Sequence, residues 1–329
     1  MKTFQIAGIE IPNRYVLAPL AGFTDYSMRK LSYEHGAGLC YTEMESCEAL
    51  VYQSKITIKD LEDTLLDKKH HPNQRLALQI FGGKKDIILQ SIPLVEKYAT
   101  YDFLDFNCGC PVPKVIRQQA GSYWLNRQDE LLDLMKELVK ISTKPVIIKI
   151  RIGFSQITDI VPLCKKLEEA GVAAITVHGR TRKEMFSSPV HYDVIRDIKK
   201  NVNIPIIANG EITPENLLQV EKETGADAFM IGQGAIGNPT IFSSLIAVEE
   251  GKEVNKPSIE EQIFYLKEHL NTIFTIKDEH TAASIMRAIS IRYFKGFADI
   301  KKYKTRLVQC NTQNEYLNIL NEMLNDQIH

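Results

Sequence analysis

Eight short apolar runs recur along the chain before residue 232, and most are followed by an amphipathic stretch with helical periodicity. Strand and helix in regular alternation indicate a parallel sheet, and eight such units predict closure into a (β/α)8 TIM barrel, an α/β fold. An open doubly wound sheet is the alternative, but no G-x-G-x-x-G follows the first strand. The predicted strands are Tyr15–Ala18, Leu39–Met44, Leu76–Ile80, Phe103–Phe106, Val146–Ile150, Ala173–Val177, Ile204–Ala208 and Ala228–Ile231. The predicted helices include Asp86–Tyr98, Asp129–Ile141, Ile157–Ala170, Tyr192–Asn201, Pro214–Gly225 and Thr240–Glu250.

The two ends of the chain follow other patterns. Phe4–Ile6 and Ile9–Ile11 flank Ala7-Gly8, which predicts a β-hairpin that caps the bottom of the barrel. After the barrel, Ser258 with Glu261 forms the pattern of a helix capping box, and helical periodicity continues to the last residues. We therefore expect a catalytic barrel at 1–248, a linker at 249–257 and an all-α helical domain of three or four helices at 258–329. The helices predicted there are Ile259–Ile276, Thr281–Phe294 and Gln313–Asn325.

Composition narrows the class of protein. Apolar residues make up 44% and charged residues 25%, as in ordinary soluble proteins, and the net charge of −1 excludes a molecule that is basic throughout. The six cysteines form no paired framework, and the spacing of Cys108 and Cys110 is wrong for a zinc site. No signal peptide or membrane span is evident, so we expect a cytoplasmic monomer with free thiols.

In this fold the chemistry lies where the strands end, and polar or glycine residues stand at nearly every predicted end. Solvent alone explains some of that polarity, but it does not favour large hydrogen-bonding groups at so many ends. The residues in question are Pro19 to Gly22, Glu43, Gln79, Asn107 with Cys110, Lys149 with Arg151, His178 with Arg180, Asn209 to Glu211, and Gly232 to Gly234.

One of these ends carries a thiol on a stiff turn. The fourth strand runs into Asn107, then Cys108-Gly109-Cys110-Pro111, in which glycine permits a sharp turn and proline stops the strand. Taken alone, Cys110 could equally be a buried structural cysteine. Its place among the other polar strand ends favours a role in catalysis.

The rim also has the residues for a flat phosphorylated cofactor. Asn209-Gly210 and Gly232-Gln233-Gly234 follow the last two strands, where such barrels often bind phosphate through backbone N–H groups. Gln79 and Asn107 can each donate and accept, which suits a ring of alternating carbonyls and nitrogens, and Lys149 would stabilise negative charge on it. FMN fits all of these features, whereas pyridoxal phosphate would use only the phosphate site and the lysine.

With these motifs in order, the chain resembles the tRNA-dihydrouridine synthase family, and the bacterial B-type branch is the most similar. The resemblance covers nearly the full length. It is carried by Ala18 to Asp25, Gln79 to Gly82, Asn107 to Pro111, Ala120 to Ser122, Lys149 to Arg151, His178 to Arg180, Asn209 to Ile212 and Ile231 to Pro239.

The resemblance implies FMN-dependent reduction of uridine to 5,6-dihydrouridine in the tRNA D-loop, with NADPH as reductant. Hydride would pass from flavin N5 to C6 of uracil, and Cys110 would deliver the proton to C5. A thiol, with a pKa near ~8.5, is protonated at neutral pH and can still act as an acid. The implied cofactor-binding residues are Pro19, Leu20, Ala21, Gln79, Asn107, Lys149, His178, Asn209, Gly210, Glu211, Gly232 and Gln233.

A basic segment after the barrel is the predicted surface for tRNA. Between residues 287 and 306 seven basic residues stand against one acid, Asp299, with aromatic residues interleaved. A solvated helical face with core aromatics is the alternative. The expected RNA-binding residues are Asn107, Arg151 and Arg180 at the rim, and Arg287, Arg292, Lys295, Lys301, Lys302 and Lys304 in this segment.

The chain departs from the family pattern at a few positions. Gln233 stands where arginine is usual, and Ala288-Ile289 replace a usual Lys-His pair. Two rival functions remain: a dihydroorotate-dehydrogenase-like FMN enzyme acting on a free pyrimidine, and a non-catalytic tRNA-binding protein. The added helical domain argues against the first, and the complete set of rim residues argues against the second.

Overall fold

The computed structural model of the protein describes residues 2–297 and 300–327. Its larger part is a closed barrel of parallel strands in the order β10-β3-β4-β5-β6-β7-β8-β9, which confirms the predicted (β/α)8 fold. Every predicted strand overlaps an observed one. The barrel strands are β3 (Tyr15–Leu17), β4 (Leu39–Ser46), β5 (Arg75–Phe81), β6 (Phe103–Cys108), β7 (Val146–Arg151), β8 (Ile175–His178), β9 (Ile206–Asn209) and β10 (Ala228–Ile231).

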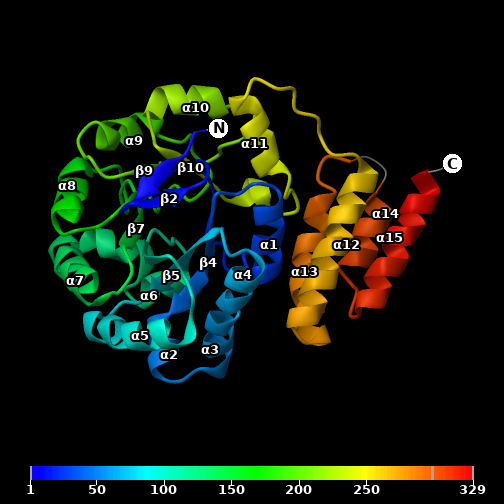
Figure 1. Ribbon diagram of the computed structural model, residues 1–329, viewed down its shortest axis with the longest axis horizontal. Helices are drawn as coiled ribbons and strands as arrows, with labels where there is room; N and C mark the ends of the chain where they lie inside the picture. The colour runs from blue at the N-terminus through cyan, green and yellow to red at the C-terminus, as the bar shows by residue number, and fades with distance from the viewer. Residues whose placement is uncertain (1, 298–299, 328–329) are drawn as a thin grey trace.

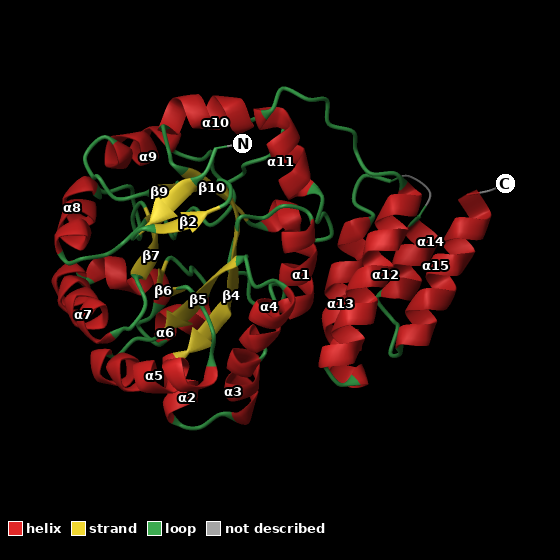
Figure 2. Ribbon diagram, in the orientation of Figure 1, coloured by secondary structure: helices red, strands yellow, loops and turns green. Residues whose placement is uncertain are grey.

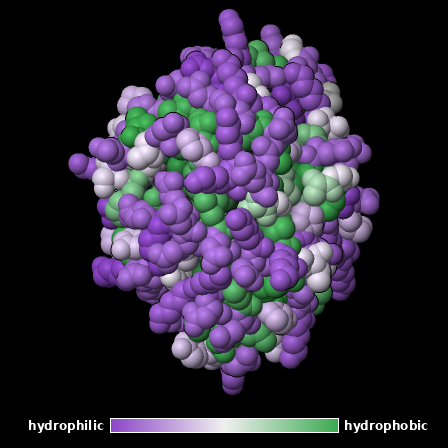
Figure 3. All heavy atoms as spheres, turned by 90° about the vertical axis from the view of Figure 1, so that its left-hand side faces the viewer, coloured by the Kyte–Doolittle hydropathy of each residue, from purple (hydrophilic) through white to green (hydrophobic). Residues whose placement is uncertain are grey.

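Helices surround the barrel on its outside (Figure 2). Helix α7 buries a narrow apolar face, on which Leu131, Leu134, Met135 and Leu138 recur at helical spacing. The outer surface is different in character. On the barrel face far from the C-terminus, hydrophilic side chains dominate and apolar ones are scattered (Figure 3). The helices are α1 (Tyr26–Glu34), α2 (Cys47–Val51), α3 (Lys55–Glu62), α4 (Thr64–His70), α5 (Lys85–Tyr98), α6 (Pro113–Arg117), α7 (Gln128–Ile141), α8 (Val161–Glu169), α9 (Tyr192–Lys199), α10 (Leu217–Thr224) and α11 (Ile241–Glu249).

Two of these helices begin three or four residues later than the sequence predicted. Helix α8 begins at Val161 rather than Ile157, and Pro162 lies in its first turn, where a missing N–H costs nothing. Helix α10 begins at Leu217 and ends before Gly225, whose left-handed backbone (φ +64°) closes the last turn. No helix in the described part of the chain is long and apolar enough to cross a membrane.

The N-terminal hairpin closes the bottom of the barrel, as predicted. Strands β1 (Phe4–Ile6) and β2 (Ile9–Ile11) pair antiparallel around Ala7 and Gly8, both of which have positive φ, as a tight hairpin turn requires. Phe4, Ile6 and Ile11 form one apolar cluster with the first inward-facing residues of the barrel strands. The opposite, carboxyl-terminal end is therefore the one left for a site.

The last part of the chain is a bundle of helices with its own apolar core (Figure 1). The predicted capping box is present, because Ser258 and Glu261 each bond the other's backbone N–H. The sequence did not resolve the short helix α14 as a separate element. The described helices are α12 (Ile259–Ile276), α13 (Glu279–Tyr293), α14 (Lys301–Leu307) and α15 (Gln313–Gln327).

The barrel and the helical bundle share a buried interface. His269 of α12 bonds the Ser27 hydroxyl of α1 through Nε2 and the Tyr293 hydroxyl through Nδ1, both at 2.9 Å. Phe23, in the loop after β3, packs against the core of the bundle. Lys277, just after α12, pairs with Asp60 of α3 and with Asp63, which follows α3. These contacts hold the bundle against α1, the end of α3 and the loop that leaves the first barrel strand.

Gly237→Ala is expected to weaken this interface strongly. Gly237 has φ +69°, and a Cβ there would lie 2.5 Å from backbone atoms of Arg292 and Tyr293 in α13. Strain and overlap together should lower the free energy of unfolding by roughly 2–5 kcal/mol, measured by urea denaturation. Gly225→Ala is the matched control, because Gly225 has a similar φ with nothing within 4 Å. Equal losses in the two variants would show that the close approach to α13 contributes nothing.

Candidate active site

Side chains from five strands meet at the carboxyl end of the barrel. Gln79, Asn107, His178 and Asn209 are all buried, and Lys149 is half-buried between them in strand order. Parallel strands place their carboxyl ends on one rim, so the predicted polar ends are brought together as expected.

An unbroken hydrogen-bonded chain of side chains connects two of these strands, β5 and β6. Residues alternate across a strand, so Asp105 and Asn107 of β6 face the barrel interior while Phe106 and Cys108 pack outward in the main core. Asn107 Nδ2 donates to Gln79 Oε1 at 2.7 Å, and Gln79 Nε2 donates to Asp105 Oδ2 at 2.6 Å. Asn107 Oδ1 accepts from the backbone N–H groups of Gly109 and Cys110. The amides therefore fix the start of the turn that carries Cys110.

Further contacts hold the rest of that turn. The Cys110 carbonyl accepts bonds from the backbone N–H and hydroxyl of Ser122, and Arg151 Nε donates to the Gly109 carbonyl at 2.8 Å. Gly121 has φ +61°, and a Cβ there would lie 2.8 Å from the Cys110 carbonyl oxygen. Among the six free cysteines only Cys110 is partly exposed, and burial raises the pKa of its thiol. Cys110 is thus a positioned thiol that keeps its proton at neutral pH.

Lys149 lies on the other side of the site. Its Nζ donates to Asn209 Oδ1 at 3.0 Å, and Asn209 Nδ2 donates to the Met230 carbonyl at 2.9 Å. Burial and the neighbouring Arg151 guanidinium lower the pKa of Lys149 to about 8. The ammonium is therefore held in the barrel mouth at a cost in free energy, as expected of a group that serves a ligand.

His178 presents an unpaired nitrogen. Its Nε2 is buried and has no hydrogen-bond partner in the described structure. Burial, with the positive charges of Lys149 and Arg151, lowers the pKa of His178 well below its usual range, so the ring is neutral. An unpaired buried nitrogen is costly and marks a place where a ligand group would be stabilised.

The glycine turns after β9 and β10 lie next to these residues. Gly210 has φ +131°, a backbone that glycine adopts easily, and a Cβ there would lie 3.3 Å from the His178 ring. At Gly232 the nearest atoms to an added Cβ are the side chains of Ala18 and Leu20, at 3.8 and 3.9 Å. Leu20, one of the predicted cofactor residues, therefore lies beside the predicted phosphate turn, and Gln233 begins the short 3-10 helix η2 (Gln233–Ala235).

The two rim arginines are internal supports in this structure. Arg151 and Arg180 are each only 2% exposed. Besides Gly109, Arg151 donates to the carbonyls of Thr181 and Met185, while Arg180 donates to the Ser188 carbonyl and pairs with Glu211 at 2.5 Å. They tie the loop after β8 to its neighbours, and contact with a substrate stays a prediction.

Several side chains of the basic segment have partners within the helical bundle. Lys302 pairs with Asp326 of α15, and Arg287 donates to the Cys310 carbonyl and the Asn311 side chain. The interleaved aromatics Tyr293, Phe294, Phe297 and Tyr303 lie in or against the bundle core rather than on a binding face. Arg292 lies beside Gly237 of the barrel, and Asp299 lies outside the described residues.

Two residues that sequence reasoning did not select lie at this site. Asp105 ends the amide chain, and its position two residues before Asn107 on one strand was the available signal. Phe186 is 50% exposed in the loop after β8, with its ring 6.0 Å from that of His178 and 5.7 Å from the Arg151 guanidinium. No periodic pattern marks such a loop residue.

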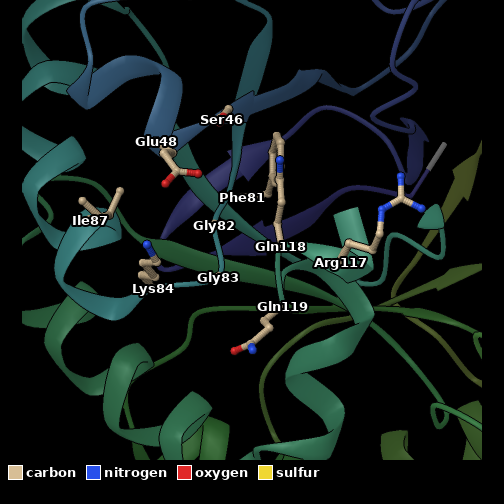
Figure 4. A pocket seen from close by; sticks show the side chains of 10 residues that line it. All are labelled: Ser46, Glu48, Phe81, Gly82, Gly83, Lys84, Ile87, Arg117, Gln118 and Gln119. Carbon is tan, nitrogen blue, oxygen red and sulfur yellow. The ribbon is translucent and has the colours of Figure 1, made fainter. Parts of the chain in front are cut away.

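A pocket of about 290 Å³ lies beyond the ends of β4 and β5, beside the loop that follows α6. Figure 4 shows Glu48 and Lys84 on one side of it and Arg117 on the other. The backbone of Gly83 lies close to that of Gln118, because a Cβ on Gly83 would lie 1.8 Å from the Gln118 carbonyl oxygen. None of the predicted site residues lines this pocket. It is lined by Ser46, Glu48, Phe81, Gly82, Gly83, Lys84, Ile87, Arg117, Gln118 and Gln119.

The fold and rim together define a (β/α)8-barrel protein with a positioned thiol and a cationic, amide-lined mouth. The family model described as dihydrouridine synthase matches residues 16–329. The chain belongs to the dihydrouridine synthase family, a family of flavin oxidoreductases, and is an enzyme. The resemblance seen in the sequence is thereby confirmed.

Individual relatives match over most of their length. tRNA-dihydrouridine synthase B of Pasteurella multocida is 34% identical, covering 89% of this chain and 87% of the relative. The synthase B of Shewanella oneidensis is 30% identical, covering 96% and 97%. The synthase B of Klebsiella pneumoniae is 38% identical, covering 73% and 74%.

Solved structures with the same barrel are more distant. TcOYE with pHBA has a TM-score of 0.59 at 13% identity, covering 79% of this chain and 95% of that chain. Morphinone reductase in complex with tetrahydroNAD has a TM-score of 0.54 at 15% identity, covering 79% and 93%. At such identities the likeness shows the fold alone.

Proposed function

We propose that this enzyme reduces uridine to 5,6-dihydrouridine in the D-loop of tRNA, with FMN as its flavin and NADPH as reductant. The observation that carries the proposal is the position of Cys110. Its protonated thiol is held, through Asn107, on the same hydrogen-bonded chain as the amide of Gln79 in the barrel mouth. The names of the relatives, each a tRNA-dihydrouridine synthase B, support the same reaction.

The residues at the mouth fit FMN. His178 Nε2 is a buried polar atom without a partner, and the open backbone around Gly232 allows an anion to approach the N–H groups of η2. Lys149 offers a positive charge to an electron-rich ring. Because Gln233 carries no charge, the backbone N–H groups and His178 would bear more of the phosphate than in relatives with arginine there.

The protein's own residues then have separate roles. When bound, reduced FMN supplies the hydride that C6 of the uracil accepts. Cys110 holds a proton on Sγ and gives it to C5, since burial keeps the thiol protonated at neutral pH. Asn107 and Arg151 hold the backbone on either side of Gly109 and so aim Sγ. Lys149 stabilises negative charge that develops beside it.

The test combines the colour of the protein with a product assay. Purified protein should show flavin absorbance and, with NADPH, form dihydrouridine on unmodified tRNA, detected by nuclease digestion and mass spectrometry. Mapping the product position would identify the uridine that is reduced. Oxidation of dihydroorotate without activity on tRNA would favour a free-pyrimidine enzyme. A colourless protein that binds tRNA would indicate a binding protein and refute the catalytic proposal.

Charge reversal at Lys301, Lys302 and Lys304 is expected to weaken tRNA binding while leaving the flavin and its reduction by NADPH intact. These side chains lie on α14, far along the chain from the rim, and Lys301 and Lys302 are exposed. Each lost phosphate contact should also reduce the slope of log affinity against log salt, by about 0.9 for duplex RNA if it behaves as B-DNA does and about 0.7 for single strand. The measurement is a tRNA titration at several salt concentrations.

The matched control reverses three exposed lysines on the far side of the barrel, Lys136, Lys140 and Lys165 of α7 and α8. Both triple variants change the net charge by the same amount. If both weaken tRNA binding equally, only overall charge matters and α14 is not an RNA surface. The RNA would then be held elsewhere, with Arg182 and Lys183 in the loop after β8 as the next residues to test.

A further inference from the structure

The hydrogen bonds from Asn107 through Gln79 to Asp105 run in one direction, and both ends of this chain of amides must agree with it. Backbone N–H groups can only donate, so the oxygen of the Asn107 amide must face Gly109 and Cys110. Its nitrogen then faces the Gln79 oxygen, which turns the Gln79 nitrogen towards Asp105. The whole arrangement therefore requires an acceptor at position 105. Without one, Gln79 and then Asn107 could rotate by half a turn and release the Cys110 backbone.

Asp105 is well placed to be that acceptor. Its side chain is fully buried, and only its Oδ2 atom is used, because Oδ1 has no partner in the described structure. A carboxyl group offers an accepting oxygen to Gln79 whether it is ionised or carries its proton on Oδ1. The amides of Gln79 and Asn107 therefore keep the same orientation in either protonation state of Asp105, although burial raises the pKa of Asp105 to about 8.

We infer that Asp105 is a positioning residue: its carboxyl oxygen orients the amides of Gln79 and Asn107 and, through them, the turn that holds the Cys110 thiol. This role was not evident from the strand-end pattern, because Asp105 lies one layer below the rim. The inference relates to the proposed function through Cys110, but the position of that thiol can be measured without flavin, NADPH or RNA.

The experiment measures the reaction of Cys110 with iodoacetamide in the full-length protein, followed by peptide mass spectrometry. The other five cysteines are buried and serve as an internal check that the fold is intact. Asp105→Leu removes the acceptor at similar volume, whereas Asp105→Asn retains an oxygen that can accept. We expect Cys110 to react about tenfold faster in Asp105→Leu and within about twofold of the parent rate in Asp105→Asn, because a buried unpaired donor is a strong drive to rearrange.

Gln79→Leu provides a second variant if Asp105→Leu does not fold, because it breaks the same chain one step later. It should accelerate alkylation of Cys110 equally, and the double variant should react no faster than either single one. Parent-like rates in Asp105→Leu, or in Gln79→Leu where that variant stands in for it, would overturn the inference. An Asp105→Asn rate as fast as that of Asp105→Leu would also overturn it, by showing that charge rather than an acceptor is needed.

A parallel assay of dihydrouridine formation separates this inference from the proposed function. If alkylation follows the expected pattern while the parent protein makes no dihydrouridine, the positioning role stands and the proposed function fails. If the parent makes dihydrouridine and all variants are alkylated alike, the proposed function stands and the positioning role fails.

Discussion

Cys110→Ala is expected to reduce dihydrouridine formation on unmodified tRNA by about 10²–10⁴-fold while the protein keeps its flavin and still oxidises NADPH. General acids contribute factors of that size, and proton donation to C5 is separate from reduction of the flavin. The turn should persist in this variant, because the bonds of the Cys110 backbone with Asn107 and Ser122, and that of Arg151 with Gly109, do not involve the thiol. The thiol adds a hydrogen bond with the Val112 backbone. Single-turnover assays with each substrate in turn separate the two half-reactions.

Cys108→Ala is the matched control for this experiment. Cys108 is fully buried and packs outward, away from the barrel mouth, so its loss should affect stability rather than the reaction. If Cys110→Ala formed dihydrouridine at the parent rate, the thiol would have no part in proton transfer. The proton would then have to come from another acid or from water.

Much of the fold could be predicted because each strand and helix of the barrel leaves a repeating pattern of apolar and polar residues in the sequence. Buried parallel strands are continuous apolar runs, and glycine and polar residues mark their ends. The apolar run Phe103–Phe106 therefore predicted a strand, and the polar residues Asn107 and Cys110 after it predicted a functional site at the end of that strand. In the structure, β6 continues two residues further, to Cys108. The hairpin at Ala7 and Gly8 was equally readable, because few residues tolerate the backbone that a tight turn needs.

Parts of the site could not be predicted because they depend on partners distant in the chain. The sequence analysis selected Arg151 and Arg180 as RNA-binding residues at the rim, and in the structure the loop after β8 folds back over both and supplies carbonyl acceptors. The basic segment around α14 looked unpaired because its charges were counted only between residues 287 and 306. The partner of Lys302 is Asp326, which a local count omits.

Lys149→Met is expected to impair both flavin binding and turnover, the latter by about 10²-fold, because the variant removes the positive charge at the mouth. The same substitution should make the flavin-free protein more stable. Burial lowers the pKa of Lys149, which means that its charge reduces the stability of the folded state. Methionine has a similar length and no charge to desolvate. Loss of function with a gain in stability is the expected signature of a residue retained for its ligand.

Asn209→Ala is a useful comparison, because it removes the only hydrogen-bond partner recorded for the Lys149 ammonium in the described structure and leaves the charge in place. It should lower the stability of the protein, whereas Lys149→Met raises it. Flavin content is measured by absorbance after gel filtration, and stability by urea denaturation of flavin-free protein. A Lys149→Met variant that keeps its flavin and its rate would show that Lys149 has no part in the chemistry.

The stability difference between Lys149→Met and the parent protein should depend on pH in a defined window. The folded protein binds the Lys149 proton less tightly than the unfolded chain does, with a pKa of about 8 against an ordinary 10.5. The cost of that charge is therefore fully present below pH 8, at no more than about 3 kcal/mol and less where the mouth admits water. Between pH 8 and 10.5 the unfolded chain binds more protons, so the parent gains stability as the pH rises and the advantage of methionine disappears. A difference that stayed constant across this window would mean that the Lys149 ammonium is as well solvated in the barrel mouth as in the unfolded chain.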